Sequence, residues 1–149
     1  MTAQLINGKL ISAQIKEEAA KEAVQIKEQG VTPCLAVVLV GNDSASKVYV
    51  RNKKQACEAV GIRSVSYELD GETTEEELLG LVAQLNDDEG VHGILVQMPL
   101  PKQINEEKII LAIDAKKDVD CFHPMNVGLL HTGGKGFLPC TPAGIIELI

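Results

Sequence analysis

Hydrophobic and polar positions follow two different patterns along the chain. Residues 34–41, CLAVVLVG, and residues 91–97, VHGILVQ, are nearly continuous apolar runs, which is typical of strands buried on both faces. Residues 8–29 and 73–87 instead repeat apolar residues at three- and four-residue steps, which predicts helices with one apolar face. The chain therefore mixes buried strands with amphipathic helices.

The same patterns predict three further elements: a helix from Ser44, taken as its N-cap, to Gly61, a strand at 63–69 and a short helix at 105–113. Thr74 and Glu77 stand in capping-box register at the start of the helix within 73–87. Strands and helices thus alternate, which favours an α/β fold, a three-layer αβα architecture with a mostly parallel sheet.

The alternation stops at residues 114–139. This stretch is longer than most connections in compact domains, so we expect it to be either functional or poorly ordered. Thr141 as N-cap and Pro142 in the first turn predict a last helix, which is still apolar at Ile149. We therefore expect residues 1–149 to form one domain that ends inside a helix.

Composition narrows the class of protein. The chain has 149 residues, 45% of them hydrophobic, enough for one buried core, and it carries a net charge of -7 without any basic cluster interleaved with aromatics. That charge argues against nucleic-acid binding. We find no membrane-spanning run and no signal-peptide pattern, and the four cysteines are scattered, so we expect a cytoplasmic protein with reduced thiols.

The helix expected after the first strand carries an unusual lysine. Ser46, Tyr49, Lys53 and Cys57 fall along one stripe of that helix, whereas Lys47 and Lys54 lie well round the helix and are interpreted as solvated charges. Two interpretations of Lys53 stay open. Either its stem packs on apolar surface while its ammonium reaches water, or partial burial makes the amine a proton-transfer group.

Gln97 and two aspartates are the other candidates. Gln97 follows a buried strand, and Pro99 and Pro101 prevent that strand from continuing. Its amide is therefore expected at the carboxyl end of the strand, where open α/β proteins bind ligands. There it could orient Lys53 or stabilise a developing negative charge. Asp118 and Asp120 could be a metal pair, a ligand-binding pair or solvated loop carboxylates.

Metal and phosphate motifs do not support a specific site. His92, His123 and His131 are scattered, and we predict no metal. The stretch GLLHTGGKGF departs from the P-loop pattern in spacing and lacks its Ser or Thr, and no GxGxxG follows the first strand.

Four segments together carry a family resemblance: VGNDSASKVYVRNKKQACEAVGI, GILVQMPLPK, KKDVDCFHPMNVG and PCTPAGIIELI. In this order they resemble the amino-terminal, folate-binding half of bifunctional methylenetetrahydrofolate dehydrogenase/cyclohydrolase. The resemblance implies that Lys53 is the catalytic lysine and that Gln97 faces it. It further implies that Tyr49 lies against the folate, that Asp120 hydrogen-bonds the pterin, and that Ser46 lies beside them.

The resemblance also implies a reaction. Such enzymes oxidise 5,10-methylenetetrahydrofolate to 5,10-methenyltetrahydrofolate with NADP and hydrolyse the product to 10-formyltetrahydrofolate, which serves one-carbon metabolism and purine biosynthesis. NADP is held mostly by a second, Rossmann-type domain that we expect to be missing here, so this chain should bind it poorly alone. The parent protein is expected to be a homodimer, and a monomer stays open for this chain.

One residue departs from the family pattern. Cys121 stands where the family usually has a glycine after the aspartate, so a positive φ there would strain the backbone and shift Asp120. Two alternatives to the enzyme remain: a non-catalytic flavodoxin-like ligand-binding module, in which Lys53 only neutralises an anion, and an interaction domain that uses the apolar segment IIELI.

Overall fold

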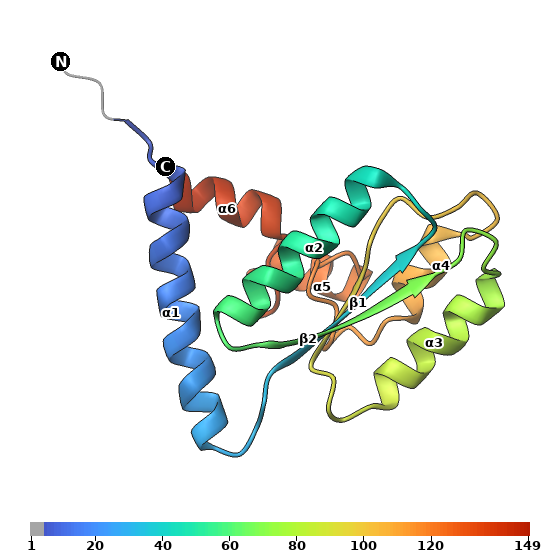
Figure 1. Ribbon diagram of the computed structural model, residues 1–149, viewed down its shortest axis with the longest axis horizontal. Helices are drawn as coiled ribbons and strands as arrows, with labels where there is room; N and C mark the ends of the chain where they lie inside the picture. Colours follow the sequence, from blue (N-terminus) through green and yellow to red (C-terminus); the bar gives the residue numbers. More distant parts are fainter. Residues whose placement is uncertain (1–4) are drawn as a thin grey trace.

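The computed structural model describes residues 5–149, which form an α/β arrangement (Figure 1). In chain order the elements are α1 Gly8–Glu28, β1 Cys34–Val40, α2 Ser44–Ala59, β2 Arg63–Leu69, α3 Glu75–Asp87, β3 Gly93–Val96, α4 Glu106–Ala112, α5 Pro124–His131 and α6 Cys140–Leu148. Among these residues no helix is both long and apolar enough to cross a bilayer.

The three strands form a parallel sheet in the order β2-β1-β3. Helix α2 covers one face of the sheet and helices α3 and α4 cover the other, as Figure 1 shows. The predicted three-layer α/β fold with a parallel sheet is therefore confirmed. The central strand β1 is buried from both sides, which explains its continuous apolar sequence.

Alternate residues of β1 supply two separate cores. Val38 and its even-numbered neighbours pack with Leu78 of α3 and Ile109 of α4, all of them fully buried. Val37 packs in the opposite direction against Val50 of α2 and Leu95 of β3. This period-two arrangement fixes the register of the sheet, because a slip by one residue would exchange the two cores.

Helix starts agree with the sequence only in part. The capping box at Thr74 and Glu77 is present, since each residue accepts a hydrogen bond from the backbone N–H of the other. The prediction of Ser44 as N-cap is wrong, because Asp43 caps α2 by accepting from the Ser46 N–H at 2.7 Å. Thr141 is also not a cap: α6 begins at Cys140, after Pro139, which offers no side-chain cap.

The segment 114–139 is more regular than its sequence suggests. It contains α5, which begins with Pro124 at its first turn and is capped by His123, whose Nδ1 accepts from the Met125 N–H at 3.2 Å. An eight-residue helix is too short to show a clear apolar period, so the pattern missed it.

Helices α1 and α6 lie at one side of the sheet and contact each other. Their apolar residues are poorly covered within the described chain: Leu10 of α1 is 57% exposed and Ile146 of α6 is 72% exposed. Of the apolar positions predicted to form the buried face of α1, only Ala23 is buried. The sequence period was correct, but in this chain little packs against that face.

Candidate active site

The candidate site is a cavity of about 810 Å³ on the α2 side of the sheet. Its floor is formed by β1 and β3, one wall by α2, and the other walls by residues 119–120 and the segment leading into α6. Four predicted site residues line it: Tyr49, Lys53, Gln97 and Asp120. A volume of this size suits a ligand of cofactor or drug dimensions.

Lys53 and Gln97 meet in this cavity. The Nζ of Lys53 donates a hydrogen bond to Gln97 Oε1 at 3.1 Å, across 44 residues of sequence. Lys53 is half-buried because Ser46 and Val50, on the adjacent face of α2, are buried toward the sheet and hold that flank of the helix over the cavity. The lysine is thus held by a specific partner and does not simply extend into solvent.

Gln97 is held in place through both its backbone and its side-chain amide. Its backbone N–H donates to the Val38 carbonyl at 2.8 Å, so the residue continues the pairing of β3 with β1. Its side-chain Nε2 donates to the Met98 carbonyl at 2.7 Å, which leaves Oε1 turned toward Lys53. A Gln held in this way can accept a hydrogen bond from a proton-transfer group without reorienting.

Asp120 lies within the electrostatic reach of Lys53. Burial raises the pKa of its carboxyl above the ordinary 3.8, the nearby Lys53 charge partly opposes this, and Asp118 adds to the increase. A carboxyl group in a cavity, with its pKa raised by burial and a cation beside it, is typical of functional sites. It is also suited to accept hydrogen bonds from a donor-rich ligand edge.

Asp118 has a structural position instead. It is 3% exposed and accepts hydrogen bonds from the His123 N–H at 2.9 Å, the Asn126 Nδ2 at 2.9 Å and the Phe122 N–H at 3.3 Å. Of the alternatives left open for the aspartate pair, a solvated loop carboxylate is therefore wrong for Asp118. Within residues 5–149 no cluster of His, Cys, Asp or Glu is suited to hold a metal ion.

The backbone directly after Asp120 is strained at Cys121. Cys121 has a φ of 59° and is 2% exposed, so a residue with a side chain occupies the left-handed conformation that glycine adopts most easily. The positive φ on which the expected strain at this position depended is therefore present. The turn directly follows Asp120 and so helps to set the direction of that side chain.

Tyr49 and Ser46 have different surroundings although both lie on α2. Tyr49 lines the cavity and is 59% exposed, so its ring is available at the cavity mouth. Ser46 is 3% exposed and is not among the cavity-lining residues. The structure therefore brings Tyr49, Lys53, Gln97 and Asp120 together, whereas it places Ser46 behind them in the first turn of α2.

Several lining residues were not predicted, including His92, Phe137, Cys140 and Thr141. The cavity extends along the face of the sheet from Gln97 at the carboxyl end of β3 to His92 at its amino end, and so it is not confined to the strand carboxyl ends. Cys140 and Thr141 belong to the motif PCTP, within one of the four segments that carry the family resemblance. This motif was the one signal in the sequence that these two residues belong to the site. Nothing local in the sequence indicates that Phe137 closes the same cavity.

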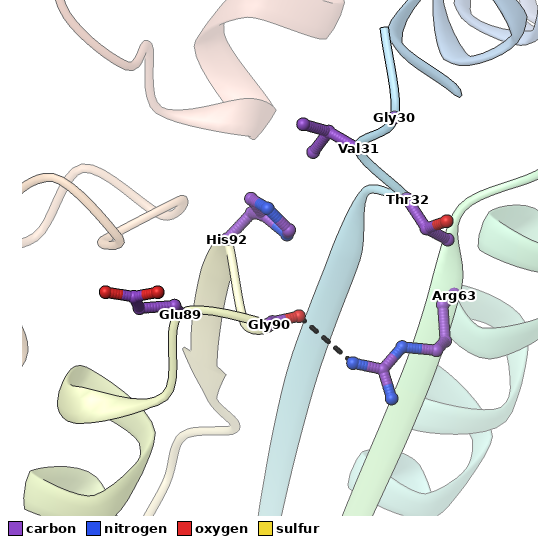
Figure 2. Close-up of a pocket in the computed structure, with 7 residues that line it drawn as sticks. All are labelled: Gly30, Val31, Thr32, Arg63, Glu89, Gly90 and His92. Atoms are coloured by element: carbon purple, nitrogen blue, oxygen red, sulfur yellow. Dashed lines mark hydrogen bonds between the residues drawn. The ribbon is translucent and has the colours of Figure 1, made fainter. Parts of the chain in front are cut away.

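A second cavity of about 460 Å³ lies at the amino ends of the strands and shares His92 with the first (Figure 2). Arg63 at the start of β2 lines it, but its guanidinium Nη2 donates to the Gly90 carbonyl at 3.0 Å, as the dashed line in Figure 2 marks. Glu89 lines the same cavity. With its guanidinium bonded to the backbone and a carboxylate nearby, this cavity is a weaker candidate than the one that holds Lys53.

Comparison with known proteins agrees with the geometry. The family model "Tetrahydrofolate dehydrogenase/cyclohydrolase, catalytic domain" matches residues 6–120. The bifunctional protein FolD of Agathobacter rectalis is 62% identical over 147 residues, which are 99% of this chain and 53% of that protein. The chain thus spans about half the length of the curated relatives it matches.

Solved structures give the same result. The bifunctional enzyme FolD, methylenetetrahydrofolate dehydrogenase/cyclohydrolase, from Campylobacter jejuni superimposes with a TM-score of 0.94 at 50% identity, over 97% of this chain and 52% of that one. The Trypanosoma brucei dehydrogenase-cyclohydrolase, solved with NADP cofactor and an inhibitor, gives 0.93 at 35% identity, over 99% and 52%. These matches fit the catalytic domain of an enzyme and not the non-catalytic flavodoxin-like module.

Proposed function

Because the chain belongs to the tetrahydrofolate dehydrogenase/cyclohydrolase family, we propose that its cavity binds reduced folates. In the parent protein it would serve the oxidation of 5,10-methylenetetrahydrofolate and the hydrolysis of 5,10-methenyltetrahydrofolate to the 10-formyl compound. One observation carries the proposal: the 3.1 Å hydrogen bond between Lys53 and Gln97, next to Asp120, inside a cavity of about 810 Å³.

In the hydrolysis of the methenyl group, the proposed role of Lys53 is proton transfer. Water adds to the bridging carbon, the bond from that carbon to ring nitrogen N5 breaks, N5 takes up a proton, and one proton is released overall. In its neutral amine form Lys53 removes the proton from the attacking water, becomes an ammonium and then gives that proton to N5, while Gln97 Oε1 keeps the side chain aimed into the cavity. Proton transfer of this kind contributes about 10²- to 10⁴-fold to a rate.

The other lining residues orient the folate. Asp120 accepts hydrogen bonds from the pterin, whose edge is rich in N–H donors, and Tyr49 offers an exposed ring for the flat part of the ligand. Ser46, which is 3% exposed in the first turn of α2, supports this face from behind these residues. For the oxidation step, holding the reactive carbon in position is the main contribution these residues can make.

NADP supplies the hydride acceptor of the oxidation step when it is bound. The described residues offer no glycine-rich turn between a strand and a helix: β1 leads to α2 through Gly41, Asn42 and Asp43. We therefore propose that NADP is held mainly by a part of the parent protein outside this chain. The NADP complex of the Trypanosoma brucei relative supports NADP as the cofactor.

Three finer proposals accompany this function. The parent protein is a homodimer, it acts in the cytoplasm, and its 10-formyl product serves purine biosynthesis. The four cysteines are free thiols, which suits a reducing compartment. Sedimentation equilibrium of the parent protein tests the first of these, and a homodimer should give twice the mass of one chain.

The function is tested by following the loss of 5,10-methenyltetrahydrofolate absorbance with this chain, with Lys53→Met and with buffer. We expect a rate above buffer that falls by about 10²-fold or more in Lys53→Met. Lys16→Met, an exposed lysine of α1, is the matched control and should keep the full rate. Equal rates for the chain and for Lys53→Met would refute the role of Lys53.

A further inference from the structure

Helix α2 has a second groove on the flank opposite Lys53. It has a volume of about 390 Å³ and lies between α2 and the edge strand β2. Lys47, Arg51 and Lys54 line it from the helix, and Ser66 and Glu68 line it from the strand. The three basic residues recur at four- and three-residue steps, so they form one stripe along this side of α2.

These three cations are not neutralised by ion pairs. The ion pairs found within residues 5–149 join Lys21 to Glu17 and Lys108 to Glu75, far from the groove. Lys47 donates only to the neutral side-chain oxygen of Asn42, at 2.8 Å. In a chain with a net charge of -7, a concave surface with three unpaired cations is a local exception.

Ser66 forms part of the strand side of the groove. Its Oγ is buried and has no hydrogen-bond partner among the described residues, yet the residue lines the groove. Val65 and Tyr67, its neighbours on β2, pack into the opposite core, so Ser66 stands on the face toward α2. The Oγ of Ser66 is itself covered from the groove, and the Oγ of Ser64, which does not line the groove, is equally without a partner, so the proposal rests on the cations alone.

The acidic residues around the groove limit the class of ligand. Glu68 lines it, so the lining carries three positive charges and one negative charge, a net of +2. Glu58 lies one turn beyond Lys54 on α2 and faces the same end. A singly charged anion gains little there, whereas a ligand with several charges can engage the three cations at once.

We propose that this groove binds a compact polyanion carrying two or more phosphate or carboxylate groups. Lys47, Arg51 and Lys54 would contact its charged oxygens. The site is separate from the candidate folate cavity, because the two lie on opposite flanks of α2 and share no lining residue. It therefore does not depend on the proposed enzymatic function.

The test is calorimetric titration of the 149-residue chain with pyrophosphate and, separately, with citrate, at low and at physiological salt. We expect saturable binding that weakens as salt rises. The double variant Arg51→Gln/Lys54→Gln should lose at least tenfold in affinity, because it removes two of the three cations that line the groove. Preference for pyrophosphate assigns a phosphate ligand, and preference for citrate assigns a carboxylate ligand.

Lys9→Gln/Lys16→Gln is the matched control, since it removes two exposed charges from α1 and changes the net charge equally. It should bind as the unmodified chain does. The proposal is overturned if neither probe binds at concentrations up to about 10 mM, a range that already includes weak sites. It is also overturned if the control double variant loses as much affinity as the groove double variant.

Discussion

Replacing Asp118 by alanine tests whether this buried carboxylate organises the segment that carries Asp120. The substitution leaves the backbone N–H of His123 without an acceptor and removes the weaker bond to the Phe122 N–H. The Asn126 amide loses one acceptor but keeps its bond to the Ala115 carbonyl at 2.8 Å. Two short charge-assisted hydrogen bonds and one long one are lost together.

The size of the effect follows from these bonds. A hydrogen bond to a charged group contributes about 1.5 to 3 kcal/mol, so the two short bonds together contribute about 3 to 6 kcal/mol. Removing a 3% exposed carboxylate also relieves its desolvation cost, which offsets part of that sum. We expect Asp118→Ala to lower the free energy of unfolding by about 3 kcal/mol.

Urea unfolding followed by circular dichroism measures this difference. Asp118→Asn keeps the shape and one acceptor oxygen but turns an NH₂ group toward the donors, so it should cost about 1 to 2 kcal/mol. Asp87→Ala, at the exposed end of α3, should stay within about 0.5 kcal/mol. A loss below about 1 kcal/mol for Asp118→Ala would show that these hydrogen bonds do not hold the segment in place.

Three further predictions concern the residues around the cavity. Because burial raises the pKa of Asp120 above 3.8, its contribution to stability is greatest below pH 3.8 and is lost as pH rises through the raised pKa, so Asp120→Asn should be more stable than the unmodified chain at pH 7. Urea midpoints across pH should show that advantage shrinking toward pH 3.8, while folate binding at pH 7 weakens; an advantage that grows on acidification contradicts the sign. At Cys121, where φ is 59°, glycine relieves about 1 kcal/mol of strain but loses a buried side chain, so Cys121→Gly should stay within about 1 kcal/mol, whereas the β-branched Cys121→Val should cost more than about 2 kcal/mol by thermal unfolding; equal costs argue against the strain. A Cβ on Gly93 would lie 2.6 Å from Val119 Cγ1, so Gly93→Ala should destabilise by about 1 to 3 kcal/mol, whereas Gly80→Ala in α3, with nothing within 4 Å, should stabilise by about 0.5 to 1 kcal/mol; a stable Gly93→Ala would contradict this contact.

The fold was predictable where one physical rule dominated. The apolar run of β1, rich in valine and ended by a glycine, is typical of a strand buried on both faces, and the capping box at Thr74 fixes the start of α3 through local hydrogen bonds. Where two neighbours could serve the same purpose, the sequence was ambiguous: Asp43 and Ser44 are both good caps, and the chain uses Asp43. Helix α5 was missed because it depends on tertiary contacts more than on its own pattern.

The candidate site divides in the same way. From the residues alone the pairing of Lys53 with Gln97 stayed a possibility, and the family resemblance was what implied that Gln97 faces the lysine; the structure places their Nζ and Oε1 atoms 3.1 Å apart. The lining by Phe137 and the buried position of Asp118 could not be predicted, since both depend on how residues 114–139 fold back onto the sheet. The burial of Ser46 depends on the rotation of α2, which the helical wheel alone does not fix.

The central claim is that reduced folate occupies the cavity beside Lys53. The most direct measurement is acetylation of the chain by an amine-reactive reagent with and without tetrahydrofolate, with each lysine followed by mass spectrometry. The account predicts that saturating tetrahydrofolate slows the acetylation of Lys53 by tenfold or more and leaves Lys16, an exposed lysine of α1 that lines neither cavity, unchanged. Unchanged labelling of Lys53, or equal protection of Lys53 and Lys16, would contradict it.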